Sequence, residues 1–364
     1  MSQLLARLYR ELQIATDVVK RAEIRARIAS YLARVGRFAE TRQIIGELRL
    51  EFGDCRNGHV TAWIMLTEGL LHLYENLSPL ALDRVAGSQA LGLAMKDASI
   101  TAVASAWKAH LEFETSNFDA MVKSLQLAIA HAGEHDHDAH ARLAMVISDS
   151  FRICGEKRPA QAWFLCSHDH ALKDGDHASI EALLYNRAAF SLARIRVERC
   201  LGDVDVNQLS LIRLDIASAR NFQSLIDISA FTNFIHLCDA RLLILEENYA
   251  EAIETLGVIR NARPFAKYNF NQSFVDLELA FCLQHLGRVD EARSTYSSIA
   301  WSSFDGLDVD EKLVAAWMQH VMCAVDESLG SLDETRVRLD ALTMKYEDMR
   351  AKLLTSLQPF QDIA

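Results

Sequence analysis

One short pattern recurs along this 364-residue chain and constrains its fold more than any other feature. In its clearest copy, Leu277–Ile299, an apolar helical stretch ends at Gly287 and a second helical stretch opens with two acidic residues. Glycine readily adopts the left-handed conformation that ends a helix, and acidic residues are favoured in the first turn of the next one. Ala292 and Tyr296 then follow at helical spacing. The pattern predicts two helices packed against each other as a hairpin.

The same turn position occurs at six places, and its spacing indicates an array of hairpins. Most successive positions lie about 40 residues apart, and each of the two wider gaps is expected to hide one irregular hairpin. The chain has only 15 glycines and 4 prolines and lacks a period-2 run of β-branched residues, so we predict an all-α fold. The six positions are Gly36, Ser116, Gly155, Glu247, Gly287 and Gly330.

The ordered series of small residue, turn, alanine and aromatic residue resembles the tetratricopeptide repeat (TPR) family. In one copy the resemblance is carried by Ala280, Gly287, Ala292 and Tyr296. The units are longer than usual and are similar to the long-repeat bacterial variant in MalT-type sensor regions. The resemblance implies a right-handed α-solenoid of about eight antiparallel helical hairpins, in which the first helix of each hairpin lines a concave groove.

Composition does not shift along the chain, so we predict a single solenoid domain over residues 1–364. Because terminal units of a solenoid need a cover, residues 1–18 are predicted to be an N-terminal cap helix and residues 344–360 a C-terminal cap helix. No output module is recognised, so we expect the array to act alone or through another chain. The predicted hairpins span residues 20–52, 58–95, 98–131, 136–172, 176–218, 222–262, 271–300 and 307–343.

Charge and cysteine usage limit the partners and the compartment. The net charge is −11 without a Lys/Arg-rich run, which argues against nucleic acid as a partner. No signal-peptide core or 18-residue apolar run is recognised, so we expect a cytoplasmic protein that does not bind a membrane. The seven cysteines form no CxxC pair, which suits a reducing compartment. They are Cys55, Cys154, Cys166, Cys200, Cys238, Cys282 and Cys323.

A histidine-rich stretch at residues 131–140 is the sharpest local oddity. Its His135, His137 and His140 are weak candidates for binding zinc or nickel. The stretch aligns with other polar inter-hairpin loops, and its spacing does not match a closed zinc site. We therefore interpret it as a solvated loop and predict no metal or other cofactor. His170, near the next equivalent loop, keeps the metal alternative open if the two loops lie side by side.

No catalytic motif is found, so the chain is predicted not to be an enzyme and no catalytic residue is assigned. The better candidate is the groove implied by the TPR resemblance. Arginine side chains there suit carboxylates of a peptide or partner, although they could instead pair with Glu181, Glu198 or other carboxylates of the chain. The predicted groove residues are His110, Glu114, Arg142, Asp149, Arg152, Asn186, Arg187, Arg194, Arg241 and His285.

These features predict a non-enzymatic scaffold that binds a protein or peptide in a bacterial regulatory or defence assembly. One alternative is a ligand- or peptide-sensing subunit that switches a separate output protein. Another is a metal-binding protein that uses the 131–140 loop. The amphipathic segment Met344–Leu354 could also join two copies into a homodimer.

Overall fold

The computed structural model describes residues 2–53, 57–202, 206–226, 232–261 and 271–361. Within these ranges the chain forms α-helices and short 3-10 helices but no strand, which confirms the predicted all-α class. Predictions that fall on Cys55 and on parts of the 222–262 hairpin lie outside the described residues. Among the described residues, no helix has the length and apolar character needed to cross a membrane.

The helices follow the predicted hairpins closely and pack in adjacent pairs. One helix is longer than expected, the second of the fifth hairpin, which continues to Ile226. The α-helices are α1 (Gln3–Ile14), α2 (Val18–Arg34), α3 (Phe38–Phe52), α4 (Gly58–Asn76), α5 (Leu80–Met95), α6 (Ala98–Glu114), α7 (Phe118–His131), α8 (His137–Cys154), α9 (Lys157–Asp174), α10 (His177–Leu201), α11 (Val206–Ile226), α12 (Thr232–Leu245), α13 (Tyr249–Asn261), α14 (Gln272–His285), α15 (Val289–Ser297), α16 (Val309–Val325) and α17 (Leu332–Ser356), with 3-10 helices η1 (Trp301–Gly306), η2 (Glu327–Leu329) and η3 (Gln358–Phe360).

Positive φ angles mark the hairpin turns. All six predicted turn positions have one, including the non-glycine residues Ser116 (φ 55°) and Glu247 (φ 60°). In each of the two wide gaps a further pair of helices packs together, α4 with α5 and α10 with α11, and the first helix of each pair is followed by a positive φ angle, at Leu77 (φ 51°) and at Gly202 (φ 95°). The expectation that each gap hides one irregular hairpin is therefore confirmed. The turn at Leu77 lies within the predicted 58–95 hairpin, directly before Ser78 and Pro79, but a bulky residue gives no sequence signal for its left-handed backbone. Positive φ angles also occur between hairpins, at Gly53, Lys96 and Gly175.

The position five residues after each predicted turn is buried, whatever residue occupies it. Thr41, Met121 and Thr335 stand where the repeat usually has alanine, and their exposed fractions are 0%, 0% and 6%. Thr41 can be buried because its hydroxyl donates to the backbone oxygens of Arg37 and Ala29, at 3.1 and 3.3 Å. The close contact between paired helices is thus kept without alanine.

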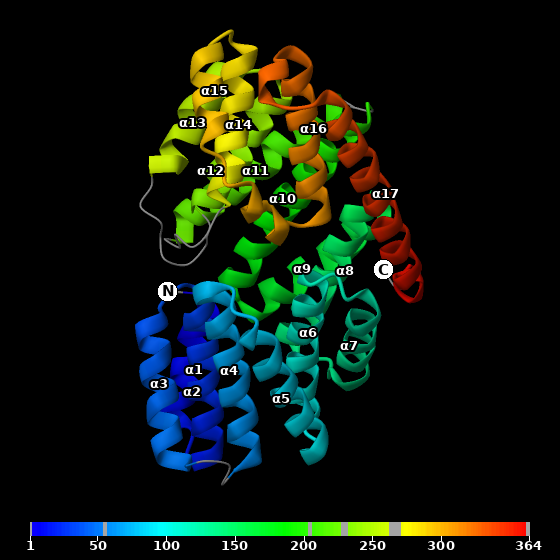
Figure 1. Cartoon of the computed structure of the whole chain (residues 1–364). Coiled ribbons are helices and arrows are strands. Elements are labelled where there is room, and N and C mark those ends of the chain that lie inside the picture. The colour runs from blue at the N-terminus through cyan, green and yellow to red at the C-terminus, as the bar shows by residue number, and fades with distance from the viewer. Residues whose placement is uncertain (1, 54–56, 203–205, 227–231, 262–270, 362–364) are drawn as a thin grey trace.

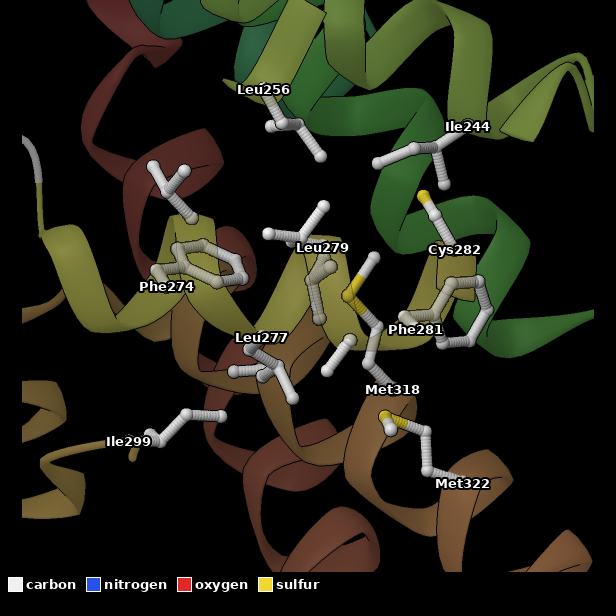
Figure 2. Close-up of a cluster of buried hydrophobic side chains, with 14 of the residues drawn as sticks. Ile244, Leu256, Phe274, Leu277, Leu279, Phe281, Cys282, Ile299, Met318 and Met322 are labelled. Atoms are coloured by element: carbon white, nitrogen blue, oxygen red, sulfur yellow. The ribbon is translucent and has the colours of Figure 1, made fainter. Parts of the chain in front are cut away.

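Helix α14 lies at the centre of the largest apolar cluster. Every residue from Phe274 to Gln284 is buried, as expected for a helix that is covered on all sides. Figure 2 shows its side chains facing Ile244 and Leu256 on one side and Met318 and Met322 on the other. The stretch that reveals the repeat in the sequence is therefore the core of the C-terminal half.

Two halves of the molecule are joined in the middle and tied again at the end of the chain. Helices α1–α9 make one half, α10 leads into the other, and α17 returns to lie beside α7 and α8 (Figure 1). The chain just after α17 is also fastened to α9, because Trp163 Nε1 donates to the backbone oxygen of Phe360 in η3 at 3.0 Å. Helix α17 is continuous across residue 344, so no separate C-terminal cap helix begins at that position.

Candidate functional site

Helix α8 presents a row of charged side chains toward α6 and α10. Arg142, Asp149 and Arg152 recur at intervals of seven and three residues, which places them along one side of the helix. Asn186 of α10 donates from Nδ2 to Asp149 Oδ2 at 2.8 Å. Arg142 and Asp149 are each only 3% exposed, so this part of the predicted groove is buried rather than open.

Arg142 lies over an aromatic ring. Its guanidinium carbon lies 3.7 Å from the centre of the Trp107 ring, and Nη1 donates to Met145 Sδ at 3.1 Å. Nε and Nη2 are buried and have no hydrogen-bond partner among the described residues, and the same is true of these two atoms in Arg152. Two arginines of α8 therefore keep unsatisfied donors.

His110 and Glu114 of α6 lie on the other side of the row. Burial, together with the charge of Arg142, lowers the pKa of His110 to about 3, so its ring is neutral at pH 7. Its Nε2 lies 3.8 Å from Glu114 Oε1, but this contact is not an ion pair when the ring is neutral. Glu114 is 46% exposed, yet the surrounding protein and the carboxylates of Asp308 and Asp149 raise its pKa to about 7.

The arginines of α10 are already paired within the chain. Arg187 lies 2.6 Å from Asp215, and Arg194 pairs with Glu198 and with Gln208. Arg187 and Arg194 therefore match the second interpretation of the sequence, in which the arginines pair with carboxylates of the same chain. Such pairs leave fewer donors for a partner.

The last two predicted groove residues have partners within the chain. Arg241 of α12 pairs with Glu278 of α14, its Nε lying 2.8 Å from Oε1. His285 is exposed and stacks on Tyr249, with the two ring centres 4.6 Å apart. The ten predicted groove residues are thus not one continuous surface.

The sequence suggested Glu181 as a possible partner of the arginines, but in the structure its hydrogen-bond partner is a glutamine. It is 1% exposed and accepts a hydrogen bond from Gln223 Nε2 at 3.1 Å. Burial raises its pKa to about 8. This carboxyl is best accommodated in its protonated form.

A pocket of about 180 Å³ opens where α6, α10, α16 and α17 meet. Its walls are mainly apolar, and Glu114, Arg194, Asp308 and Asp310 bring charge to it. Burial and the neighbouring acidic residues raise the pKa of Asp308 to about 6. Sequence reasoning missed most of this pocket, because acidic residues at the start of α16 look like ordinary helix caps. The apolar lining includes Phe113, Phe118, Ile153, Phe190, Tyr346, Met349 and Leu353.

Two histidines of the 131–140 stretch contact a histidine of α9. His137 Nδ1 and His170 Nδ1 are 3.0 Å apart, and the His140 ring stacks on His170 with centres 4.6 Å apart. His135 is exposed. In the part of the chain that the structure describes, no group of three or more histidine, cysteine or acidic side chains is arranged to hold a metal ion.

Comparison with known proteins gives no relative to guide the assignment. No model of a known protein family matches the chain, and no curated protein is significantly similar to it. The function must therefore be inferred from the geometry of these side chains.

Asp149 is expected to make stability depend on pH. Burial raises its pKa to about 7, from 3.8 in an exposed chain, although the charge of Arg152 opposes the rise. The folded state thus binds more protons than the unfolded state between these values, and the free energy of unfolding falls as pH rises from about 4 to about 7. Asp149→Asn removes this titration, so its stability should fall less between pH 5 and pH 8.

Urea unfolding of parent and variant at the two pH values measures this difference. Asp119→Asn, at an exposed position on α7, is the matched control and should behave as the parent does. Equal losses of stability in the parent and in Asp149→Asn would show that Asp149 is ionised throughout this range.

Proposed function

We propose that the chain is a non-enzymatic recognition scaffold, a TPR-like α-solenoid that holds a segment of a partner protein or peptide. The repeated turns and the buried positions that follow them support the repeat architecture. The observation that carries the binding role is the pocket between α6, α10, α16 and α17, because it combines apolar walls with charged side chains at a junction of hairpins.

The dimensions of the pocket favour a side chain over a larger ligand. Pockets for drug-sized molecules usually exceed about 300 Å³, whereas this one measures about 180 Å³. Phe113, Phe190 and Tyr346 provide an apolar lining that suits one large aliphatic or aromatic anchor. A short segment of a partner can place such an anchor while the rest of it lies outside.

The charges around the pocket favour a basic residue beside that anchor. Glu114, Asp308 and Asp310 contribute three carboxyl groups, whereas the one arginine, Arg194, already pairs with Glu198. Burial is the main cause of the raised pKa values of all three carboxyl groups, because it disfavours their ionised forms, and a positive counter-charge beside them would stabilise those forms. A lysine or arginine of the partner would supply it. This differs from the arginine–carboxylate mechanism expected from the sequence, because the α10 arginines are already paired.

Selection from a random peptide display library tests the proposal. The parent should enrich peptides that share one large apolar residue next to a lysine or arginine. The double variant Glu114→Gln/Asp310→Asn should bind the enriched peptides at least tenfold more weakly, as measured by fluorescence anisotropy. The control is Asp119→Asn/Glu134→Gln, which removes two exposed carboxylates outside the pocket and should bind as the parent does. Peptides that bind both double variants equally would place the binding site elsewhere.

A further inference from the structure

A cavity of about 650 Å³ lies in the C-terminal half, bordered by α10, α12, α14 and α16. It is much larger than the pocket of the proposed function, and it falls within the range of about 300–1,000 Å³ that is usual for small-molecule sites. Leu77, which directly follows α4, also lines it, so the cavity reaches the junction of the two halves (Figure 1). Its charged lining residues are Arg196, Arg241 and Glu311.

Much of the cavity lining is aromatic or aliphatic. The rings of Tyr185 and Phe234 meet edge to face with their centres 5.9 Å apart, and both residues line the cavity. Phe274 contributes a third ring. An aromatic group of a ligand can pack against rings arranged in this way. The aliphatic lining includes Leu192, Leu237, Val275 and Leu307.

Two arginines are held at the cavity by a shared carboxylate and a shared ring. Arg196 Nη2 and Arg241 Nε both donate to Oε1 of Glu278, which is fully buried. The guanidinium carbons of the two arginines lie 5.2 and 5.0 Å from the centre of the Phe274 ring. One buried carboxylate thus serves two guanidinium groups, whose positions are fixed before a ligand binds.

The outer edge of Arg241 is open toward the cavity. Its Nη1 and Nη2 make no hydrogen bond with a described residue, and neither belongs to the buried unpaired atoms found elsewhere in the described chain. Nη2 lies 3.6 Å from Oε1 of Glu311, whose side chain lines the cavity and is 31% exposed. This edge therefore faces the open space, and its two parallel donors suit both oxygens of a carboxylate.

Glu311 stands beside this edge as an opposite charge. A separation of 3.6 Å is too long for a hydrogen bond, so Arg241 and Glu311 lie side by side without satisfying one another. The surrounding protein raises the pKa of Glu311, and a cationic group of a ligand would oppose that rise. The pair thus offers one partner for an anionic group and one for a cationic group at adjacent positions.

We propose that the cavity binds one free α-amino acid with an aromatic side chain. Its carboxylate accepts from the Nη1–Nη2 edge of Arg241, and its ammonium group donates to Glu311. Its ring packs beside Tyr185 and Phe234. An α-amino acid carries its two opposite charges on the same carbon atom, which matches the adjacent arginine and glutamate. A simple carboxylate would instead place a like charge next to Glu311, which is unfavourable.

Isothermal titration calorimetry at pH 7.5 with three ligands that share an indole ring tests this proposal. L-Tryptophan has both charged groups, indole-3-propionate lacks the amino group, and tryptamine lacks the carboxylate. The parent should bind one equivalent of L-tryptophan at least tenfold more tightly than either analogue. The absence of saturable binding of L-tryptophan would overturn the proposal, and so would an analogue that binds equally well.

Glu311→Gln separates the roles of the two charges. It should weaken the binding of L-tryptophan at least tenfold and leave the binding of indole-3-propionate equal or tighter, because the like charge is removed. Glu254→Gln, at an exposed position on α13 outside the cavity, is the control and should bind as the parent does. A Glu311→Gln variant that keeps the parent's preference for L-tryptophan would contradict the proposal. Because Glu311 does not line the pocket of the proposed function, peptide binding there can succeed or fail independently.

Discussion

Replacing Glu278 by leucine is expected to lower the free energy of unfolding by about 3–5 kcal/mol. Glu278 is fully buried, and its Oε1 accepts hydrogen bonds from both Arg196 Nη2 and Arg241 Nε. Arg196 is itself 6% exposed, so it cannot recover water when the carboxylate is lost. The cost therefore comes mainly from leaving two guanidinium groups without their shared partner.

The position of this ion pair in the fold adds to its expected effect. Arg196 lies on α10, Arg241 on α12 and Glu278 on α14, and Arg241 also lies 3.6 Å from Glu311 of α16. Four first helices of successive hairpins are thus joined by one charged network. Loss of its central carboxylate should loosen the packing of the whole C-terminal half.

Urea unfolding followed by circular dichroism measures the change. Glu254→Leu, which replaces an exposed carboxylate on α13, is the control and should stay within about 0.5 kcal/mol of the parent. In the triple variant Glu278→Leu/Arg196→Met/Arg241→Met the unpaired charges are removed, so part of the lost stability should return. A Glu278→Leu variant as stable as the control would mean that the two arginines find other partners.

The hairpins could be predicted from sequence because their determinants are local. One short segment contains all three signals of a hairpin. These are the residue at the turn, a small residue five positions later, and an apolar residue about four positions after that. Ser116 and Glu247 were predicted as turns from their spacing although neither is glycine, and both have positive φ angles. Leu77 shows the limit, since nothing in a leucine side chain indicates that its backbone has a positive φ angle.

The candidate site was harder to predict because it depends on contacts between hairpins that are distant in the sequence. Glu114 and Asp308 influence one another although almost 200 residues separate them. An arginine on a helix also looks the same in sequence whether it is free or paired across hairpins. Arg196 of α10, which pairs with Glu278 of α14, and Arg142, which lies over Trp107 without a carboxylate partner among the described residues, represent these two outcomes, and their difference comes from how neighbouring hairpins pack.

The return of α17 to the N-terminal half leads to the second large effect. Phe360→Ala is expected to lower the free energy of unfolding by about 3–5 kcal/mol, because it empties a space that a fully packed aromatic side chain now fills. Phe360 is 1% exposed, and Leu353 and Leu357 beside it are fully buried in the same apolar cluster. Helix α17 begins beside α16 and its other end reaches α7 and α8. Phe360, Leu353 and Leu357 therefore anchor the C-terminal end of the chain in the N-terminal half.

Met344→Ala is the control, since Met344 lies on α17 but is 71% exposed, and it should change stability by less than about 0.5 kcal/mol. Urea unfolding gives the loss, and hydrogen exchange should show faster exchange near residues 350–361 in Phe360→Ala. Tyr346, Met349 and Leu353 of α17 also line the pocket for which we propose peptide binding, so detaching this helix should disrupt that pocket as well. Equal stability and exchange in the two variants would mean that α17 does not tie the halves together, and the pocket would then have to form without it.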